Sequence, residues 1–290
     1  MPLDLRALTV SGLQSAFVDA GYLTGDELAT SLFLALSMKK PLLLEGAPGV
    51  GKTEAARTLA TVLGRELVRL QCYEGISTQQ ALYEWNYPRQ LLALRRPGKA
   101  ANLYSDEFLD ERPLLTVLKS PDRYVLLIDE IDRADHEFEA FLLEFLSDFQ
   151  ISIPEIGTLK ANVPPPVILT SNRTRALHEA LRRRCLYHWI DYPDATREAE
   201  IIRLRVPEAA PEASRAVARA VLSLRQRKVS KAPGISEAID WARAASLLRG
   251  EQGDWPLAFR KTIGAVLKDG DDLAYLRDDL DHFLADVCAE

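Results

Sequence analysis

The stretch PLLLEGAPGVGKT, residues 41–53, decides the fold of this chain. It begins with an apolar run, Pro41 to Leu44, that has the length and composition of a buried strand. It ends with Gly46-Ala47-Pro48-Gly49-Val50-Gly51-Lys52-Thr53, which matches the GxxxxGK[ST] phosphate-binding loop. Because that motif is informative only between a strand and a helix, the helix-forming stretch that follows it matters. The sequence therefore predicts a nucleotide site at residues 46–53.

The residue types of this loop suit the binding of ATP phosphates and Mg²⁺. Glycines allow the backbone N–H groups to point inward, and the following helix directs its positive end toward the same place. Lys52 is expected to contact the β- and γ-phosphates, and Thr53 to place its hydroxyl on Mg²⁺. The alternative is a glycine-rich turn that merely joins strand to helix, which Lys52 and Thr53 disfavour. The residues expected to bind the nucleotide are Gly46, Ala47, Pro48, Gly49, Val50, Gly51, Lys52, Thr53 and Asp129.

An acidic motif follows a second apolar run, Val125-Leu126-Leu127-Ile128. This run delivers Asp129 and Glu130 to the end of a buried strand, where open α/β sheets form their binding crevice. Asp129 is predicted to hold Mg²⁺, and Glu130 to polarise the water that attacks the γ-phosphate. The alternative is an acidic strand end that is merely solvated. The chain lacks an Asn-Lys-x-Asp base-reading motif, and adjacent carboxylates suit water activation, so hydrolysis is favoured over phosphoryl transfer.

A polar residue also ends a third apolar run, Val167-Ile168-Leu169-Thr170-Ser171. The next residue is Asn172. A side-chain amide at this position is able to orient the attacking water and to sense the γ-phosphate. We therefore add Asn172 to the predicted catalytic residues.

Short apolar runs alternate with helical segments in the first two thirds of the chain. This alternation is typical of a parallel sheet between helices, so we predict an α/β fold with a five-stranded sheet. A helix is expected over Asp26 to Met38, with Thr24 as its cap. The predicted strands are Pro41 to Leu44, Leu67 to Gln71, Tyr124 to Ile128, Val167 to Thr170 and Tyr187 to Ile190.

The strand pattern stops near Asp191-Tyr192-Pro193-Asp194, and helical patterns separated by Pro and Gly take over. We therefore predict an α/β nucleotide-binding core over residues 1–193 and a small α-helical lid domain over 194–290. The predicted helices of the second domain are Thr196 to Arg205, Glu212 to Arg227, Ser236 to Leu248, Leu257 to Lys268 and Asp272 to Val287.

The composition narrows the functional class. The net charge is −6 over 290 residues, which gives no general attraction to nucleic acid or to anionic lipid. The three cysteines, Cys72, Cys185 and Cys288, form neither a CxxC metal site nor a disulfide framework, so a reducing compartment is expected. The early apolar run Leu32 to Leu36 is too short for a membrane span, and the first residues do not have the pattern of a secretory signal. We predict a cytoplasmic protein with no membrane span.

Taken together, these motifs resemble those of AAA+ ATPases. The resemblance rests on the phosphate loop, Asp129-Glu130, Asn172, the segment Glu179 to Arg184 and the helical C-terminal domain. Other stretches resemble the MoxR branch: Leu42 to Thr53, Asp129 to Ala134, Leu142 to Leu146, and Gln150 to Glu155. The segments Gln71 to Gly75 and Tyr83 to Tyr87 resemble the members associated with carbon monoxide dehydrogenase maturation.

The resemblance implies an oligomer and a protein client. Family members assemble as hexameric rings and act as chaperones that remodel or activate target enzymes, often by maturing a molybdenum or other metal cofactor. They commonly act with a partner that carries a von Willebrand factor A domain. The runner-up is an AAA+ motor acting on nucleic acid, which the net charge disfavours.

The resemblance also implies two insertions, which would face the ring pore or its rim. One is expected at about residues 72–94 and the other at 150–161, the latter as a hairpin that turns at Pro154 to Gly157. Tyr83, Trp85 and Tyr87 in the first insertion are either an aromatic loop that grips the client or a core cluster, because alternate spacing fits both.

Two basic positions complete the comparison with the family. Arg184 falls where the family carries its arginine finger, which acts on the neighbouring subunit's site; the alternative is a solvated basic helix end. The family's basic residue near the start of the helix at Gly234-Ile235-Ser236-Glu237 is missing. Lys231 and Arg227 are the nearby candidates for that role.

Overall fold

The computed structural model describes residues 7–95, 102–154, 156–227, 229–252, 254–277, 279–280 and 282–284. The chain divides into two units, and each is described by itself. The first unit runs to Trp189, apart from Gly21–Leu23 and Ala47–Gly51. These two short segments group with the second unit, which continues from Ile190.

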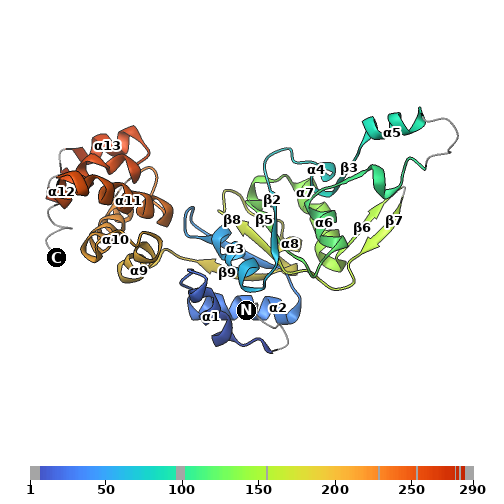
Figure 1. The fold of residues 1–290 in the computed structure, drawn as a ribbon, viewed down its shortest axis with the longest axis horizontal. Helices are drawn as coiled ribbons and strands as arrows, with labels where there is room; N and C mark the ends of the chain where they lie inside the picture. The colour runs from blue at the N-terminus through green and yellow to red at the C-terminus, as the bar shows by residue number, and fades with distance from the viewer. Residues whose placement is uncertain are drawn as a thin grey trace. The chain divides into compact units, whose positions relative to one another are not determined.

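A five-stranded sheet forms the centre of the first unit, in the order β2-β5-β8-β1-β9 (Figure 1). The neighbours β2/β5, β5/β8 and β8/β1 pair in parallel. Every residue of β1 and β8 is buried, so both faces of the central strands are covered, which explains their unbroken apolar runs. The predicted sheet is confirmed. Its strands are β1 (Leu42–Gly46), β2 (Glu66–Gln71), β5 (Tyr124–Asp129), β8 (Val167–Ser171) and β9 (Leu186–Ile190).

Helices cover this sheet, and two of them, α3 and α6, both pack on β5. The predicted helix at Asp26–Met38 is confirmed as α2, but its predicted cap is wrong. The N-cap is Gly25, and the Thr24 hydroxyl donates to the Gly25 carbonyl instead. The helices of this unit's core are α1 (Val10–Asp19), α2 (Asp26–Met38), α3 (Lys52–Val62), α6 (Pro113–Lys119), α7 (His136–Asp148) and α8 (Glu179–Arg184).

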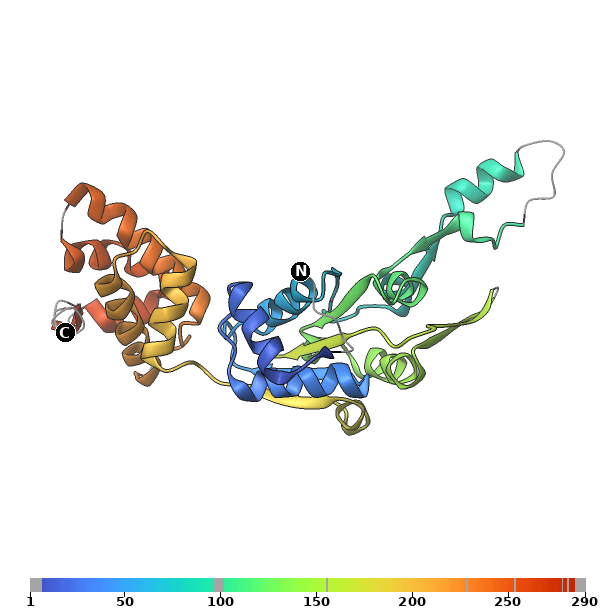
Figure 2. The same cartoon turned by 60° about the horizontal axis from the view of Figure 1, so that its bottom comes forward.

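Two antiparallel hairpins extend from the sheet in the same general direction (Figure 2). The predicted second hairpin is confirmed as β6 (Gln150–Ile153) and β7 (Gly157–Lys160). In the first, α4 (Thr78–Leu82) leads into β3 (Tyr83–Trp85), which pairs with β4 (Leu109–Glu111). The helix α5 (Tyr87–Leu94) lies at the outer end of this arm (Figures 1 and 2). Sequence patterns missed β4 because it has only three residues, two of them acidic.

The three aromatic residues of the first insertion differ in burial, which supports the core interpretation for Trp85 and Tyr83, while client gripping by Tyr87 stays a prediction. Trp85 is buried in the core, and its ring meets the ring of Tyr83 edge to face at 5.9 Å between centroids. Tyr83 is half-buried against the same core. Tyr87, the first residue of α5, is 62% exposed. Tyr87 is therefore the most exposed of the three rings.

The second unit is helical, as predicted, and encloses its own core around Trp241, Phe259 and Val221. The predicted helix Leu257 to Lys268 is wrong at both ends: α12 starts at Trp255 and gives way to a 3₁₀ turn, Ile263–Ala265. The Thr262 hydroxyl explains this end, because it donates to the Ala258 carbonyl and accepts from the Trp241 indole. The helices are α9 (Ala195–Arg205), α10 (Pro211–Gln226), α11 (Ile235–Gln252), α12 (Trp255–Lys261) and α13 (Gly270–Arg277).

The last predicted helix, Asp272 to Val287, begins earlier than expected, since α13 starts at Gly270. It ends at Arg277, and part of the predicted span, together with Cys288, lies outside the described residues. Across the described part of the chain, none of the helices has the length and apolar character needed to cross a bilayer.

Candidate functional site

The phosphate loop joins β1 to α3, which begins at Lys52. Gly49 and Gly51 have φ angles of 77° and 94°, in the left-handed region that side chains disfavour, so glycine is required at these two turns. Lys52 is 7% exposed, and its Nζ donates to the Gly46 carbonyl at 2.8 Å. The loop is thus folded over its own lysine.

Burial lowers the pKa of Lys52 to about 8, although Asp132, Asp129 and Glu130 oppose this by favouring the charged form. A half-desolvated ammonium gains more from a phosphate than a hydrated one does. The residue therefore suits the predicted contact with the β- and γ-phosphates.

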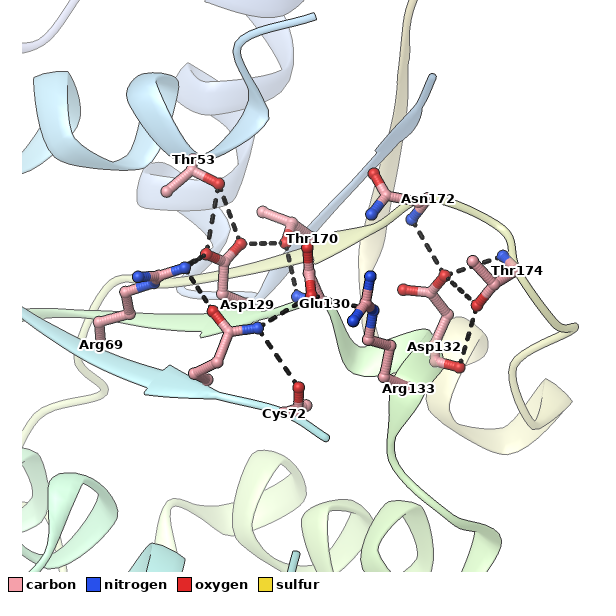
Figure 3. A network of polar contacts seen from close by, with 11 residues as sticks. Thr53, Arg69, Cys72, Asp129, Glu130, Asp132, Arg133, Thr170, Asn172 and Thr174 are labelled. Carbon is pink, nitrogen blue, oxygen red and sulfur yellow. Dashed lines mark hydrogen bonds and ion pairs between the residues drawn. The ribbon is translucent and has the colours of Figure 1, made fainter. Parts of the chain in front are cut away.

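Asp129 lies at the end of β5, beside the first turn of α3 (Figure 3). It is 2% exposed, and its carboxylate accepts from the Thr53 hydroxyl at 3.0 Å. Thr170 at 2.5 Å and Arg69, whose Nε lies at 2.8 Å, complete its partners. The carboxylate is therefore fixed from three strands or helices at once.

Glu130 adopts left-handed backbone angles, φ 55° and ψ 49°, which are uncommon for a non-glycine residue and cluster at functional sites. Its backbone N–H donates to the Thr170 hydroxyl at 2.9 Å. Its side-chain Oε2 accepts from Gln71 and from Arg133, each at 3.0 Å. The carboxylate is thus held between Gln71 at the end of β2 and Arg133 in the 3₁₀ turn that follows Glu130 (Figure 3).

Asn172 follows β8, and its backbone N–H donates to Asp132 Oδ2 at 3.2 Å. The same oxygen accepts from the backbone and the hydroxyl of Thr174, at 2.8 and 2.7 Å. Asp132 is 2% exposed and follows Glu130 by two residues. It therefore fixes the position of Asn172 relative to the acidic turn (Figure 3).

Arg184 is not brought to this site within its own chain. It is exposed at the end of α8, where it donates to the Ser147 hydroxyl and to the Ala180 carbonyl. Arg183 pairs with Glu179, and the Arg182 guanidinium lies over the Tyr187 ring. The finger assignment for Arg184 stays a prediction.

The two candidates for the lid's basic residue, Arg227 and Lys231, both have contacts within the second unit. Arg227 pairs with Asp279 at 2.8 Å, and Lys231 is exposed, with its backbone N–H bonded to Asp272. Another basic residue of this unit, Arg225, forms a buried two-point pair with Glu198 at 2.7 and 2.8 Å.

Four residues at the site were missed or not assigned a role by sequence reasoning: Arg69, Gln71, Asp132 and Thr170. The parallel register of β2 and β5 pairs Gln71 with Asp129, so every second residue near the end of β2 faces the acidic motif. Strand pairing is not visible in one sequence. Thr170 and Asp132 did lie within quoted motifs, and their polar character inside buried runs was the available signal.

The donor set fits the magnesium that the motifs imply. A hydroxyl and a carboxylate are hard oxygen ligands, as Mg²⁺ requires, and Thr53 and Asp129 hold theirs within 3.0 Å of each other. They are the residues that would hold the ion, which would neutralise phosphate charge.

Comparisons with known proteins identify the family of this chain. The family model of the AAA domain (dynein-related subfamily) matches residues 41–185. Chaperone MoxR1 of Mycobacterium tuberculosis is 27% identical over 194 residues, which cover 66% of this chain and 43% of that protein. Protein NorQ of Paracoccus denitrificans is 28% identical over 190 residues, covering 61% of this chain and 62% of NorQ. The predicted MoxR resemblance is confirmed.

A solved structure supports the fold alone. A mutant of Thermotoga maritima RuvB has a TM-score of 0.53 at 18% identity and covers 97% of this chain and 75% of that chain. The predicted phosphate-loop α/β core with a helical C-terminal region is therefore confirmed. The matched part of the chain spans less than two thirds of MoxR1 and NorQ.

Proposed function

The chain belongs to the AAA domain family, dynein-related subfamily, and from that premise we propose that it hydrolyses ATP with Mg²⁺ to remodel a client protein. The observation that carries the proposal is the contact of Thr53 with Asp129, flanked by Glu130 in its strained turn. A solvated acidic strand end would not hold its carboxylate 2% exposed against the first turn of the phosphate-loop helix.

Each residue has a distinct part in the proposed reaction. Lys52 and the loop N–H groups bind the phosphates, while Thr53 and Asp129 hold the ion. Glu130 takes the proton of the attacking water as the γ-phosphoryl group is transferred to that water and ADP leaves. Asn172, fixed through Asp132, orients the water or the γ-phosphate.

The proposed active form is a homo-oligomer, in keeping with the hexameric rings of the AAA+ class. Head-to-tail contacts allow a residue of one subunit to reach the next subunit's nucleotide. Arg184 is exposed at the end of α8 and donates to Ser147 on α7 rather than to its own site's carboxylates. This placement supports a role in trans.

The proposed client is a protein in the cytoplasm, and a molybdenum or other metalloenzyme is the specific candidate. Support comes from the similarity to MoxR1, which is a chaperone by name, and from the resemblance of the 71–75 and 83–87 segments to the carbon monoxide dehydrogenase branch. A partner with a von Willebrand factor A domain belongs to the same proposal.

The test is steady-state phosphate release by the purified chain with Mg²⁺ and with a chelator. Turnover should require Mg²⁺ and should be lost in Asp129→Asn. The matched control is Glu66→Gln, because this carboxylate lies at the opposite end of the β2/β5 pair and is 64% exposed. Turnover that survives in Asp129→Asn, or that falls equally in Glu66→Gln, contradicts the proposal.

Adding nucleic acid to the turnover assay distinguishes a protein client from a nucleic-acid client. A remodelling ATPase of net charge −6 should show turnover that duplex or single-stranded DNA does not raise. Strong stimulation that disappears steeply with salt would instead favour the motor acting on nucleic acid.

A further inference from the structure

A pocket of about 200 Å³ lies between the two hairpin regions of the first unit, away from the phosphate loop. Its floor is apolar, with Leu82, Phe145 and Ile151 exposed by 3% or less. Tyr83 and Phe141 are half-buried at its sides. Small-molecule sites are usually ~300 to 1,000 Å³, so this pocket suits one or two protein side chains.

One carboxylate, Glu144, lines the pocket, and two more lie on the same face of α7. Glu137, Phe141, Glu144 and Asp148 follow one another at intervals of four, three and four on α7, which places them on one face. The three carboxylates are exposed, and none has an ion-pair partner among the described residues. A ligand of this surface therefore combines an apolar side chain with positive charge.

The chain carries a surface of that chemistry on α5. Tyr87, Leu91 and Leu94 are spaced i, i+4, i+7 on one face of the helix and are 62%, 61% and 61% exposed. Arg95 follows Leu91 by four residues and is exposed beside it, and Arg89 is exposed three residues before Leu92, which is itself 61% exposed. Contiguous exposed apolar residues of this kind mark an interaction site.

The helix cannot use its own chain's pocket in this structure. Gln90, three residues after Tyr87, is 6% exposed, and its side-chain amide donates to the Leu103 carbonyl at 2.7 Å. The rings of Trp85 and Tyr104 meet edge to face at 5.3 Å below it. These contacts hold α5 at the outer end of the β3/β4 arm (Figures 1 and 2). The pocket is lined by residues of α4, β3, α7 and β6 and by none of α5.

We propose that α5 of one copy of this chain docks into the pocket of a second copy, with a leucine in the pocket and arginines against the α7 carboxylates. The surfaces differ, so the contact is heterologous, and repeating it generates a ring or an open chain. The proposal goes beyond the proposed function, because it assigns a contact surface between copies and does not depend on hydrolysis.

Association variants test the two surfaces. Sedimentation velocity with ATP should show that Leu91→Asp weakens association of the full chain roughly tenfold or more, because an apolar side chain loses its burial. Glu144→Lys should weaken it as well, and Arg89→Glu with Arg95→Glu in the same chain should restore part of the loss. Leu247→Asp is the matched control: Leu247 is 72% exposed on α11, outside both surfaces. Unchanged association in Leu91→Asp and Glu144→Lys overturns the proposal, and so does a chain that stays monomeric with ATP.

Cross-linking identifies the occupant. A benzophenone amino acid at position 91, in a mixture of isotope-labelled and unlabelled chains, should join unlike copies and react near Phe141 or Ile151. Cross-links within one copy, or elsewhere on the second copy, contradict the docking. A peptide with leucines between arginines that fills the pocket of the assembled protein, with the Leu91 cross-links unchanged, shows that a client segment is the occupant and overturns the proposal.

Discussion

Gln71 on β2 donates from Nε2 to Oε2 of Glu130 at 3.0 Å. The same glutamate oxygen accepts from Arg133. A carboxylate held by two donors is less free to approach a water molecule than one held by none. The strand beside the acidic motif therefore controls the group that is proposed to activate water.

Removing this hydrogen bond should raise basal turnover. Gln71→Leu should increase ATP hydrolysis by the purified chain by about tenfold or more, since a hydrogen bond to a charged group is worth roughly 1.5–3 kcal/mol. The dissociation constant for ATP should stay the same, as measured by calorimetry. Gln71→Asn keeps an amide on a shorter side chain, and its turnover should lie between that of the unchanged chain and that of Gln71→Leu. Turnover unaffected by Gln71→Leu would remove this contact from the mechanism.

Arg69 is paired with Asp129, the carboxylate that is proposed to hold Mg²⁺. Its Nη2 lies 2.6 Å from Asp129 Oδ2, and its side chain is 48% exposed, so it can swing away when the ion binds. Arg69→Met should lower the Mg²⁺ concentration needed for half-maximal binding of the ATP complex, by several-fold. Calorimetric titration of nucleotide at stepped Mg²⁺ concentrations measures this directly. Arg123→Met, at the opposite end of the same strand pair, is the control and should change nothing.

The buried lysine predicts a pH dependence. The pKa of Lys52 is about 8 in the nucleotide-free chain, and phosphate charge should raise it toward its ordinary value of 10.5. Below pH 8 the lysine is charged before and after binding; between about pH 8 and 10 binding takes up a proton, so ATP affinity falls as pH rises. Calorimetry at about pH 9 in two buffers of different ionisation enthalpy should show uptake approaching one proton. Lys52→Met should show none.

Much of this site could be predicted from the sequence because its parts are local. The phosphate loop, the Asp129-Glu130 pair and Asn172 each end an apolar run, and a parallel sheet brings such ends together. The contacts of Arg69 and Gln71 could not be predicted, because they depend on which strand lies beside β5. The predicted Thr24 cap was wrong because its hydroxyl bonds to the neighbouring Gly25 carbonyl. The predicted C-terminal end of the α12 helix was wrong because a tertiary contact between Trp241 and the Thr262 hydroxyl decides it.

Arg184 should act on a neighbouring subunit. Arg184→Ala should leave ATP binding to the isolated chain intact, while turnover falls by about 10³-fold or more, as for arginine fingers in related enzymes. A chain lacking Arg184 and one lacking Lys52 each keep the half-site that the other has lost. Mixed oligomers of the two should therefore regain activity. Verified mixed oligomers without recovered turnover would contradict action in trans and would favour a surface role for the arginine.

Glu130 is proposed to activate the attacking water, and ATP is expected to bind whether or not this carboxylate is present. The most direct measurement is single-turnover hydrolysis by Glu130→Gln, with ATP binding followed on the same protein. Glu130→Gln should bind ATP with an affinity within about twofold of the unchanged chain. It should hydrolyse ATP at least 10²-fold more slowly, since the amide cannot take the proton. Hydrolysis at the unchanged rate in this variant, with ATP bound, would contradict this role of Glu130.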